Sequence, residues 1–292
     1  MRIGLGLPNG IPGTAADNLL TWAVEGDRAG FSTLASLDRL VYDNHETLTT
    51  LAAAAAVTER ARLMTAILIA PLHTSTALLA KQSATVDQFA HGRLTLGLAV
   101  GARPDDFQAA GAEHAGRGTR FDAQLAELRA LWAGERRGFA GGVGPKPAQP
   151  GGPRLVFGGH APSAVRRAAA EGAGWISGSG GLGMFRHGAQ AFRTAWESAG
   201  RAETPTLHAL CYFSLGDDAA ELANSYLRNY YGFAPPYAEA VVNSTAIGAD
   251  AVRQSVTDYA AAGCDELILV PCSADLDQLK LLRAALPEAL TV

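Results

Sequence analysis

The chain has 292 residues, of which 48% are hydrophobic and 18% charged, and its formal net charge is −4. This composition is typical of a globular protein with a large core. The slightly acidic net charge argues against a nucleic-acid-binding protein, which would carry clustered basic residues. No apolar stretch approaches the roughly 20 residues of a membrane span, and the N-terminus MRIGLGLPNG does not resemble a signal peptide. Three scattered cysteines fit a reducing compartment, so we expect a cytoplasmic protein.

Short apolar runs alternate with helical patterns along the chain. Eight strands are predicted, which begin near Arg2, Thr33, Arg62, Arg93, Arg154, Gly174, Thr206 and Glu266. Several are continuous apolar runs, as expected for parallel strands buried on both faces. Thr14 followed by Asp17 indicates a capping box at the start of the first helix. Eight strands alternating with helices predict a (β/α)8 TIM barrel, which is an α/β fold.

The spacing of the strands predicts where the barrel carries insertions. The first four strands begin about 30 residues apart, which is the length of one βα unit. The intervals after strands four and seven are about twice as long as such a unit. The first insertion contains a Gly/Pro-rich stretch, residues 137–153, which predicts a loop, and the second contains YLRNYYGFAPPY, residues 226–237. Because no linker separates two cores, we expect a single domain over residues 1–292.

Other folds and chemistries fit the sequence less well. GLGLPNG, residues 4–10, is one residue off the dinucleotide-binding pattern, and its first two glycines lie inside the predicted strand, which leaves a Rossmann fold as the second choice. The histidines show no zinc-binding spacing, so no metal site is predicted. Gly178–Ser179–Gly180 does not form the G-x-S-x-G elbow of a serine hydrolase.

The carboxyl ends of barrel strands carry the chemistry in this kind of fold. Here they are followed by small, glycine-rich and sparingly charged segments: Pro8–Asn9, Asp38–Arg39, Pro71–His73, Gly101–Arg103, Gly158–His160, Ser177–Gly181, Ser214–Gly216 and Pro271–Ser273. Such a rim suits a large planar ligand with a few polar anchors. It lacks the paired carboxylates of a glycosidase and the acids of a divalent-metal site.

The stretch LVFGGHAPSAV, residues 155–165, leaves a strand through two glycines and enters a helix with no acid in its first turn. Free N–H groups at a helix N-terminus attract anions, and glycines let a ligand approach the backbone closely. The stretch therefore predicts either an anion site or a tight turn in which Ser163 caps the helix.

A more specific pattern lies between residues 63 and 111. AKQSATVDQFAHGRLTLGLAVG, residues 80–101, is followed by the acid-aromatic pair Asp106–Phe107. Together with GGHAPSAVRRAA and a later Gly174–Trp175, this pattern resembles the bacterial luciferase-like oxidoreductase family over nearly the whole chain. The resemblance implies a (β/α)8 barrel that binds FMN or a deazaflavin analogue, usually as a homodimer.

The resemblance also implies where the cofactor binds. The backbone of Gly159 and His160, the Ser163 hydroxyl and the helix N-terminus would hold its phosphate, and the loop after strand six would close over it. The implied cofactor-binding residues are Gly158, Gly159, His160, Ser163, Ser177, Gly178, Ser179, Gly180 and Arg103. Arg103 lies three residues after the position of a phosphate-binding arginine in luciferase, and it reaches either the phosphate or only solvent.

Four further residues are candidates for catalysis. Asp38–Arg39 lies where luciferases carry an acid followed by a catalytic histidine, so the usual base is replaced by arginine. His45 either substitutes for that base or is a solvated loop residue. Asp38 either bonds the edge of the flavin or forms an ion pair with Arg39. His73 either lines the flavin pocket or caps the end of strand three.

The aromatic residues of the second insertion have two interpretations. Tyr230, Tyr231 and Phe233 either bind substrate as part of a lid over the barrel mouth or pack as core. A long excursion in a compact domain favours a functional role, because such excursions are otherwise uncommon.

The combined expectation is a monooxygenase that uses reduced FMN and oxygen on a small apolar or aromatic substrate. Because the chain has no second nucleotide-binding motif, a separate flavin reductase would supply the reduced FMN. Two alternatives remain open: a deazaflavin-dependent oxidoreductase that transfers hydride, and a flavin-binding protein without catalytic activity.

Overall fold

The computed structural model describes residues 1–139 and 141–286. Eight parallel strands form a closed barrel: β1 (Arg2–Gly6), β2 (Thr33–Ser36), β3 (Arg62–Ile69), β4 (Leu94–Ala99), β7 (Arg154–Gly158), β8 (Gly174–Ser177), β9 (Thr206–Ser214) and β11 (Glu266–Pro271). Each strand pairs in parallel with its neighbours, and the pairings β8–β9 and β11–β1 complete the circle. The predicted (β/α)8 TIM barrel is confirmed, and each predicted strand is present.

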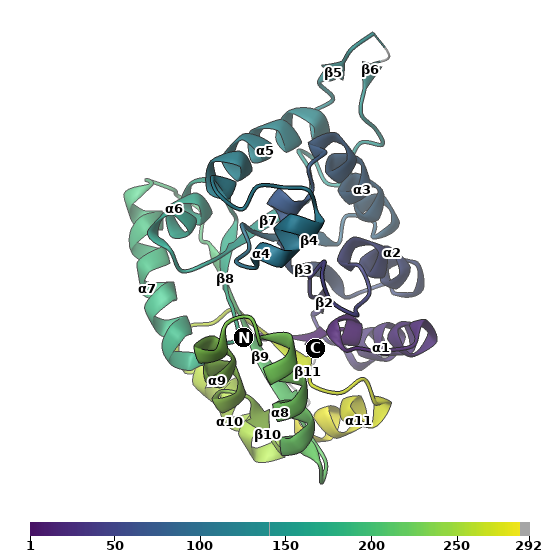
Figure 1. The fold of residues 1–292 in the computed structure, drawn as a ribbon, viewed down its shortest axis with the longest axis vertical. Coiled ribbons are helices and arrows are strands. Elements are labelled where there is room, and N and C mark those ends of the chain that lie inside the picture. Colours follow the sequence, from purple (N-terminus) through teal and green to yellow (C-terminus); the bar gives the residue numbers. More distant parts are fainter. Residues whose placement is uncertain (140, 287–292) are drawn as a thin grey trace.

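Helices surround this barrel, which Figure 1 views roughly along its axis. The ring consists of α1 (Ala16–Ala29), α2 (Thr47–Val57), α3 (Thr76–Phe89), α5 (Arg117–Trp132), α6 (Pro162–Glu171), α7 (Leu182–Ser198), α10 (Ala249–Ala261) and α11 (Leu276–Ala285). Each turns an apolar stripe to the strands, as Leu19, Trp22 and Ala23 do on α1. Within the described residues, no helix combines the length and the apolar character that crossing a membrane requires.

The predicted capping box at the first helix is wrong. The N-cap of α1 is Ala15, whose side chain offers no cap. The Thr14 hydroxyl instead donates to the carbonyl oxygens of Pro8, at 3.1 Å, and Ile11, at 2.8 Å. These carbonyls belong to the turn η1 (Pro8–Gly10) and its flank, so the hydroxyl fixes the turn after β1 rather than the helix.

Both predicted insertions are present. The first adds α4 (Pro104–Ala109) before α5, and then the antiparallel hairpin β5 (Arg136–Arg137) and β6 (Gly141–Gly142), which projects from the helix ring in Figure 1. The stretch predicted as a loop therefore starts in a hairpin. The second insertion follows β9, the seventh barrel strand, and adds α8 (Ala219–Tyr230), α9 (Pro235–Asn243) and β10 (Ala246–Ile247), which pairs with β9. We call residues 219–243 the cover segment.

The cover segment closes the interior of the barrel at the carboxyl ends of its strands. Inward-facing side chains fill the barrel, among them Met64, Val156, Tyr212 and Ile268. Tyr226, Leu227 and Tyr230 of α8 belong to the same buried cluster. Tyr226 and Tyr230 therefore extend the barrel core and lie over its mouth at the same time.

A buried polar cluster holds the opposite end of the barrel, where the strands begin. Glu266 of β11 accepts hydrogen bonds from the hydroxyls of Ser32, at 2.5 Å, and Thr33, at 2.6 Å. Its second oxygen lies 3.2 Å from Nδ1 of His208 and 3.6 Å from the guanidinium of Arg2. Burial opposes the charge of Glu266, but these partners outweigh it and lower the pKa of its carboxyl to about 2.

We expect Glu266→Gln to lower the free energy of unfolding by about 3 kcal/mol at pH 7. The substitution removes the negative charge with which the buried partners of this carboxylate interact. The unfolded pKa is near 4.5, so the wild-type carboxylate stabilises the fold above that pH and loses this contribution as pH falls toward 2. Urea denaturation at pH 7 and pH 3 should show the difference shrinking in acid. The exposed Glu221→Gln serves as control, and an equal loss in both variants would contradict the assignment.

Candidate active site

Asp38, directly after β2, lies at the mouth of the barrel. Its Oδ2 accepts a hydrogen bond of 2.8 Å from the backbone N–H of Ile69, at the end of β3. The register of β3 against β4 shifts between Thr65 and Leu68, just before this contact. Burial raises the pKa of Asp38 to about 7, against the bond from Ile69, and the charges of Glu46 and Asp106 raise it further. Asp38 can therefore hold or release a proton near neutral pH.

Arg39 and Arg103 extend two guanidinium groups toward the cover segment. Both donate to the backbone carbonyl of Tyr230, at the end of α8, over 2.9 Å and 3.3 Å. Both side chains are about 10% exposed. Burial lowers the pKa of Arg39, and the neighbouring charge of Arg103 adds to that effect. An ion pair of Arg39 with Asp38 is one of the two alternatives from the sequence, but the carboxylate that the structure places near Arg39 is Asp105, at 3.9 Å.

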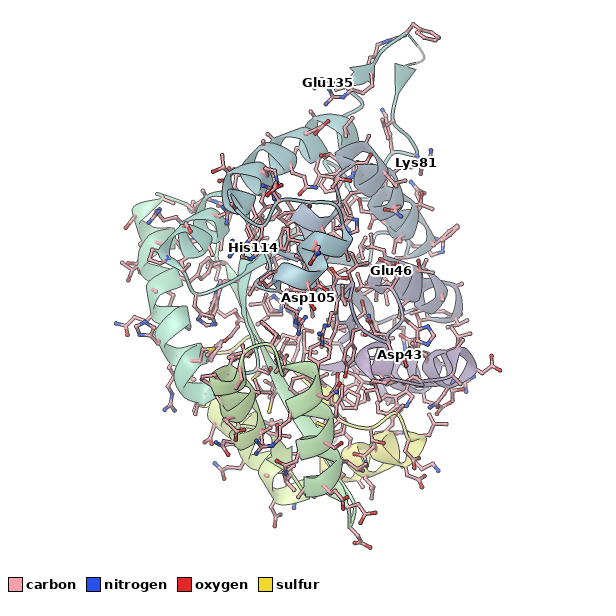
Figure 2. All side chains as sticks on the ribbon, in the orientation of Figure 1. Asp43, Glu46, Lys81, Asp105, His114 and Glu135 are labelled. Atoms are coloured by element: carbon pink, nitrogen blue, oxygen red, sulfur yellow. The ribbon has the colours of Figure 1, made fainter. Side chains whose placement is uncertain are left out.

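Asp106 fixes the loop that carries Arg39. One oxygen of its buried carboxylate accepts hydrogen bonds from the backbone N–H groups of Leu40, at 3.1 Å, and Val41, at 2.7 Å. The other lies 3.9 Å from Arg103. Figure 2 shows the neighbouring Asp105 in the middle of this face. The motif pair Asp106–Phe107 thus links the segments after β2 and β4.

Tyrosine side chains from three segments meet beneath the cover segment. Tyr230 packs against Tyr42 and Tyr231 with ring centroids 5.1 and 4.9 Å apart. The hydroxyl of Tyr231 lies 3.1 Å from that of Tyr212 on β9. Tyr230 is buried, Tyr231 is half-buried and Phe233 is exposed, so the three predicted substrate residues run from the core to the surface.

The predicted phosphate loop has the geometry of an open helix N-terminus. The N-cap of α6 is Ala161, no side chain caps the helix, and its first turn has no acid. Ser163 is exposed and does not cap, which excludes the alternative of a serine-capped turn. Gly159 has φ +114°, a left-handed conformation that favours glycine. His160 packs its ring edge-on against Trp175, and the removal of the ring from water lowers its pKa, with a further contribution from His187.

Gly158 has a packing role in addition. A Cβ at this position would lie 2.5 Å from Cδ1 of Ile67, so the glycine leaves room for that side chain inside the barrel.

The loop after β8 faces the cover segment. The buried Ser177 hydroxyl donates to the carbonyl of Gly178, and the Ser179 hydroxyl lies 3.4 Å from that of Tyr231. The Ser244 hydroxyl donates to the carbonyl of Ser179. A Cβ at Gly178 would meet the hydroxyl of Tyr237, and one at Gly180 would meet Met184. These contacts bind the loop to residues 231–244, and the structure does not turn its serines toward α6.

The two histidine candidates lie apart from each other. Nε2 of His45 is 2.7 Å from the carbonyl of Thr14, in a groove between α1 and α2. The structure therefore does not bring His45 to Asp38. His73 ends the turn η2 (Ala70–Leu72) and lines a cavity of about 380 Å³ beside α5. Burial lowers the pKa of His73, so its imidazole is neutral at physiological pH.

Sequence reasoning missed three residues at this mouth: Tyr42, Asp105 and Tyr212. Tyr42 follows Asp38–Arg39 within a few residues, and Asp105 is next to the acid-aromatic pair, so their positions after strands were a usable signal. Tyr212 lies inside an apolar strand, where the sequence gives no sign that it faces inward.

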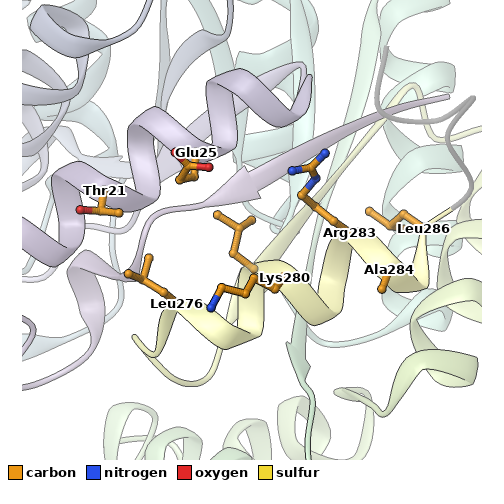
Figure 3. A pocket seen from close by; sticks show the side chains of 8 residues that line it. Thr21, Glu25, Leu276, Lys280, Arg283, Ala284 and Leu286 are labelled. Atoms are coloured by element: carbon orange, nitrogen blue, oxygen red, sulfur yellow. The ribbon is translucent and has the colours of Figure 1, made fainter.

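A second groove lies away from the mouth. It runs between α1 and α11, has a volume of about 510 Å³ and is lined by Thr21, Glu25, Leu276, Lys280 and Arg283 among others (Figure 3). It contains none of the residues that follow the barrel strands, so we assign it no part in the chemistry.

The sequence model of a family described as luciferase-like monooxygenase matches residues 1–264. The FMNH(2)-dependent dimethylsulfone monooxygenase of Pseudomonas putida is 33% identical over 154 residues, which are 47% of this chain and 42% of that protein. The F420-dependent glucose-6-phosphate dehydrogenase of Beutenbergia cavernae is 35% identical over 133 residues, which are 42% of this chain and 39% of that protein.

Among solved structures, an F420-dependent secondary alcohol dehydrogenase in complex with an F420-acetone adduct is similar with a TM-score of 0.82. The sequence identity is 16%, and the match covers 98% of both chains. This likeness shows a shared fold. The chain spans less than two thirds of the length of the curated relatives that it matches.

We expect Asp38→Asn to stabilise the protein increasingly as pH rises. Between the unfolded pKa near 3.8 and the folded pKa of about 7, the unfolded chain ionises Asp38 while the folded chain keeps it protonated, so wild-type stability falls across this window. The variant should gain roughly 1–2 kcal/mol on the wild type between pH 5 and pH 8, because one pKa unit is about 1.36 kcal/mol and partial exposure screens the effect.

Urea denaturation at both pH values measures this gain. Asp43→Asn, an exposed carboxyl on the same loop, is the control and should show no such trend. A constant difference between Asp38→Asn and wild type from pH 5 to pH 8 would show that Asp38 titrates normally.

Proposed function

Because the chain belongs to the luciferase-like monooxygenase family, we propose that it is a flavin-dependent monooxygenase that uses reduced FMN and oxygen on a small organic substrate. The observation that supports a flavin best is the uncapped N-terminus of α6 at the barrel rim, behind Gly159 in its left-handed conformation. The Pseudomonas putida relative, which is FMNH(2)-dependent by name, supports FMN as the cofactor.

The residues present fit a cofactor that ends in a phosphate. Pro162 has no N–H and the Ala164 N–H donates to the Ala161 carbonyl, so a phosphate would accept from the N–H and hydroxyl of Ser163 and from the Gly159–His160 backbone. His187, near the start of neighbouring α7, lies close enough to His160 to affect its pKa. When bound, the reduced flavin would supply the electrons that activate oxygen.

The protein would contribute proton handling and shelter from water. The Asp38 carboxyl, with its pKa of about 7, can give a proton to a reacting oxygen or take it back. His73 is placed on the same rim and, being neutral, can accept a proton. Tyr230 and Tyr231 would provide an apolar wall beneath the cover segment, which keeps water from the reacting atoms.

Three further features belong to the proposal. A separate flavin reductase would supply reduced FMN, the active form would be a homodimer in the cytoplasm, and residues 1–292 would act as one domain. The single-domain proposal is supported by the pairing of β1 with β11, since the first and last strands complete one barrel.

Hydride transfer with a reduced deazaflavin is the second candidate. The Beutenbergia cavernae relative is F420-dependent by name and supports this alternative to the extent of its 35% identity. Both cofactors carry a phosphate that the α6 N-terminus could hold, so this feature does not separate them.

We expect the purified protein to oxidise NADH or NADPH negligibly with FMN alone, and to consume oxygen on addition of a flavin reductase. Equilibrium titration under argon with reduced FMN and with reduced F420 should show tighter binding of FMN. Tighter binding of F420 would favour the deazaflavin alternative. Rapid oxidation of NADPH without a reductase would contradict the two-component scheme, and binding of both flavins without turnover would favour a protein that only binds flavin.

We expect Ser163→Asp to weaken FMN binding by about tenfold or more, because a carboxylate repels a phosphate at the same helix end. The substitution should leave the free energy of unfolding unchanged or raise it slightly, because an acid in the first helical turn is favourable. Riboflavin, which lacks the phosphate, should bind both proteins alike. Ser163→Ala is the matched control, with only the loss of one hydrogen bond. Equal FMN affinity in all three proteins would remove the phosphate from α6.

A further inference from the structure

The guanidinium groups of Arg39 and Arg103 have more donors than the surrounding residues use. Each group carries five N–H donors. One hydrogen bond from each goes to the Tyr230 carbonyl. Nε of both side chains is buried without a partner among the described residues. The unused donors lie in a region where burial makes an unpaired polar group costly.

The nearby carboxylates do not accept hydrogen bonds from these unused guanidinium donors. Asp105 and Asp106 lie 3.9 Å from the arginines, which is longer than a hydrogen bond. One oxygen of Asp106 already accepts two hydrogen bonds from the backbone of the loop after β2. Two cations at the carboxyl end of α8 do stabilise that helix, but this role uses one donor from each. The buried Nε atoms are out of reach, but Nη2 of Arg39 and Nη1 of Arg103 make no described hydrogen bond and can donate to a ligand.

Aromatic rings form the walls around these donors. The guanidinium carbon of Arg39 lies 4.3 Å from the centre of the Tyr42 ring. That of Arg103 lies 4.4 Å from the centre of the Phe233 ring and 4.8 Å from that of Tyr230. Stacking of this kind holds a guanidinium plane in a fixed orientation and leaves its edge free for a planar oxyanion.

We propose that Arg39 and Arg103 bind an oxyanion group of the organic substrate, such as a carboxylate, sulfonate or phosphate ester, while its apolar part packs on the tyrosines. This inference rests on the proposed function, because it assumes that the barrel mouth holds the substrate. It adds a charged group to the expected small apolar or aromatic substrate. The described contacts of Arg103 are with Asp106 and with Tyr230, Tyr231 and Phe233, and none is with residues 158–163, so this site is separate from the α6 N-terminus.

The test uses the folded protein without cofactor and measures binding of benzoate and of benzyl alcohol by isothermal titration calorimetry. Benzoate should bind more tightly than benzyl alcohol, which has the same ring and no charge. Arg39→Gln and Arg103→Gln should each weaken benzoate binding by about tenfold, as expected for the loss of a charge-assisted contact. Arg62→Gln, at the opposite end of the barrel, should leave it unchanged.

The comparison of the two ligands on the wild type needs no variant and remains decisive if an arginine variant unfolds. Arg103→Lys keeps the charge without the fork and should retain part of the affinity. Equal binding of benzoate and benzyl alcohol, or weakening by Ser163→Asp but not by the arginine variants, would overturn the proposal.

A parallel titration with FMN and riboflavin separates this proposal from the proposed function. If Arg103→Gln removes the preference for FMN over riboflavin, the arginines hold the cofactor phosphate and the substrate assignment is overturned. If benzoate binds through the arginines but neither FMN nor F420 binds, the flavin-dependent function fails and the anion site stands.

Discussion

The parallel pairing of each strand with the next is the constraint on which the rest of the molecule depends. Backbone N–H and C=O groups inside a barrel cannot form hydrogen bonds with water, so every strand must pair with a strand on each side. Because β1 pairs with β2 on one side and β11 on the other, the carboxyl ends of the eight strands form one rim. That rim gathers Asp38, Arg103 and Tyr230 from segments that lie far apart in the chain.

Burial then decides the chemistry of the rim by a single cause with opposite effects. Removal from water favours the neutral form of an acid and of a base alike, so it raises the pKa of Asp38 and lowers that of Arg39. The carboxyl becomes a group that exchanges protons at neutral pH, while arginine remains charged under all ordinary conditions. The same low dielectric strengthens the attraction between the guanidinium groups and any anion beside them. One side chain is thereby suited to move protons, and the other two to hold charge.

The barrel could be predicted from the sequence because continuous apolar runs such as RLTLGLAV leave few alternatives at that length. The open N-terminus of α6 could also be predicted, since the absence of an acid or a cap is visible in the letters. The hydrogen-bond partners of the hydroxyl groups could not be predicted, because they depend on tertiary neighbours. The Thr14 hydroxyl donates to the turn before its helix, and the Ser179 hydroxyl lies near that of Tyr231. The segments after the strands contain few charged residues, so the sequence predicts a sparingly charged rim. No local pattern in the sequence shows that Arg39 and Arg103 donate to the same carbonyl.

The cluster around Glu266 lies at the opposite end of the barrel from this chemistry, and the separation has a consequence for substitutions. The polar network that anchors the strand starts shares no described hydrogen bond or ion pair with Asp38, Arg39 or Arg103. Substitutions at the two ends should therefore have nearly additive effects on stability. Position 39 carries an arginine where the resemblance would place a histidine, and a substitution there should leave the polar cluster around Glu266 unchanged.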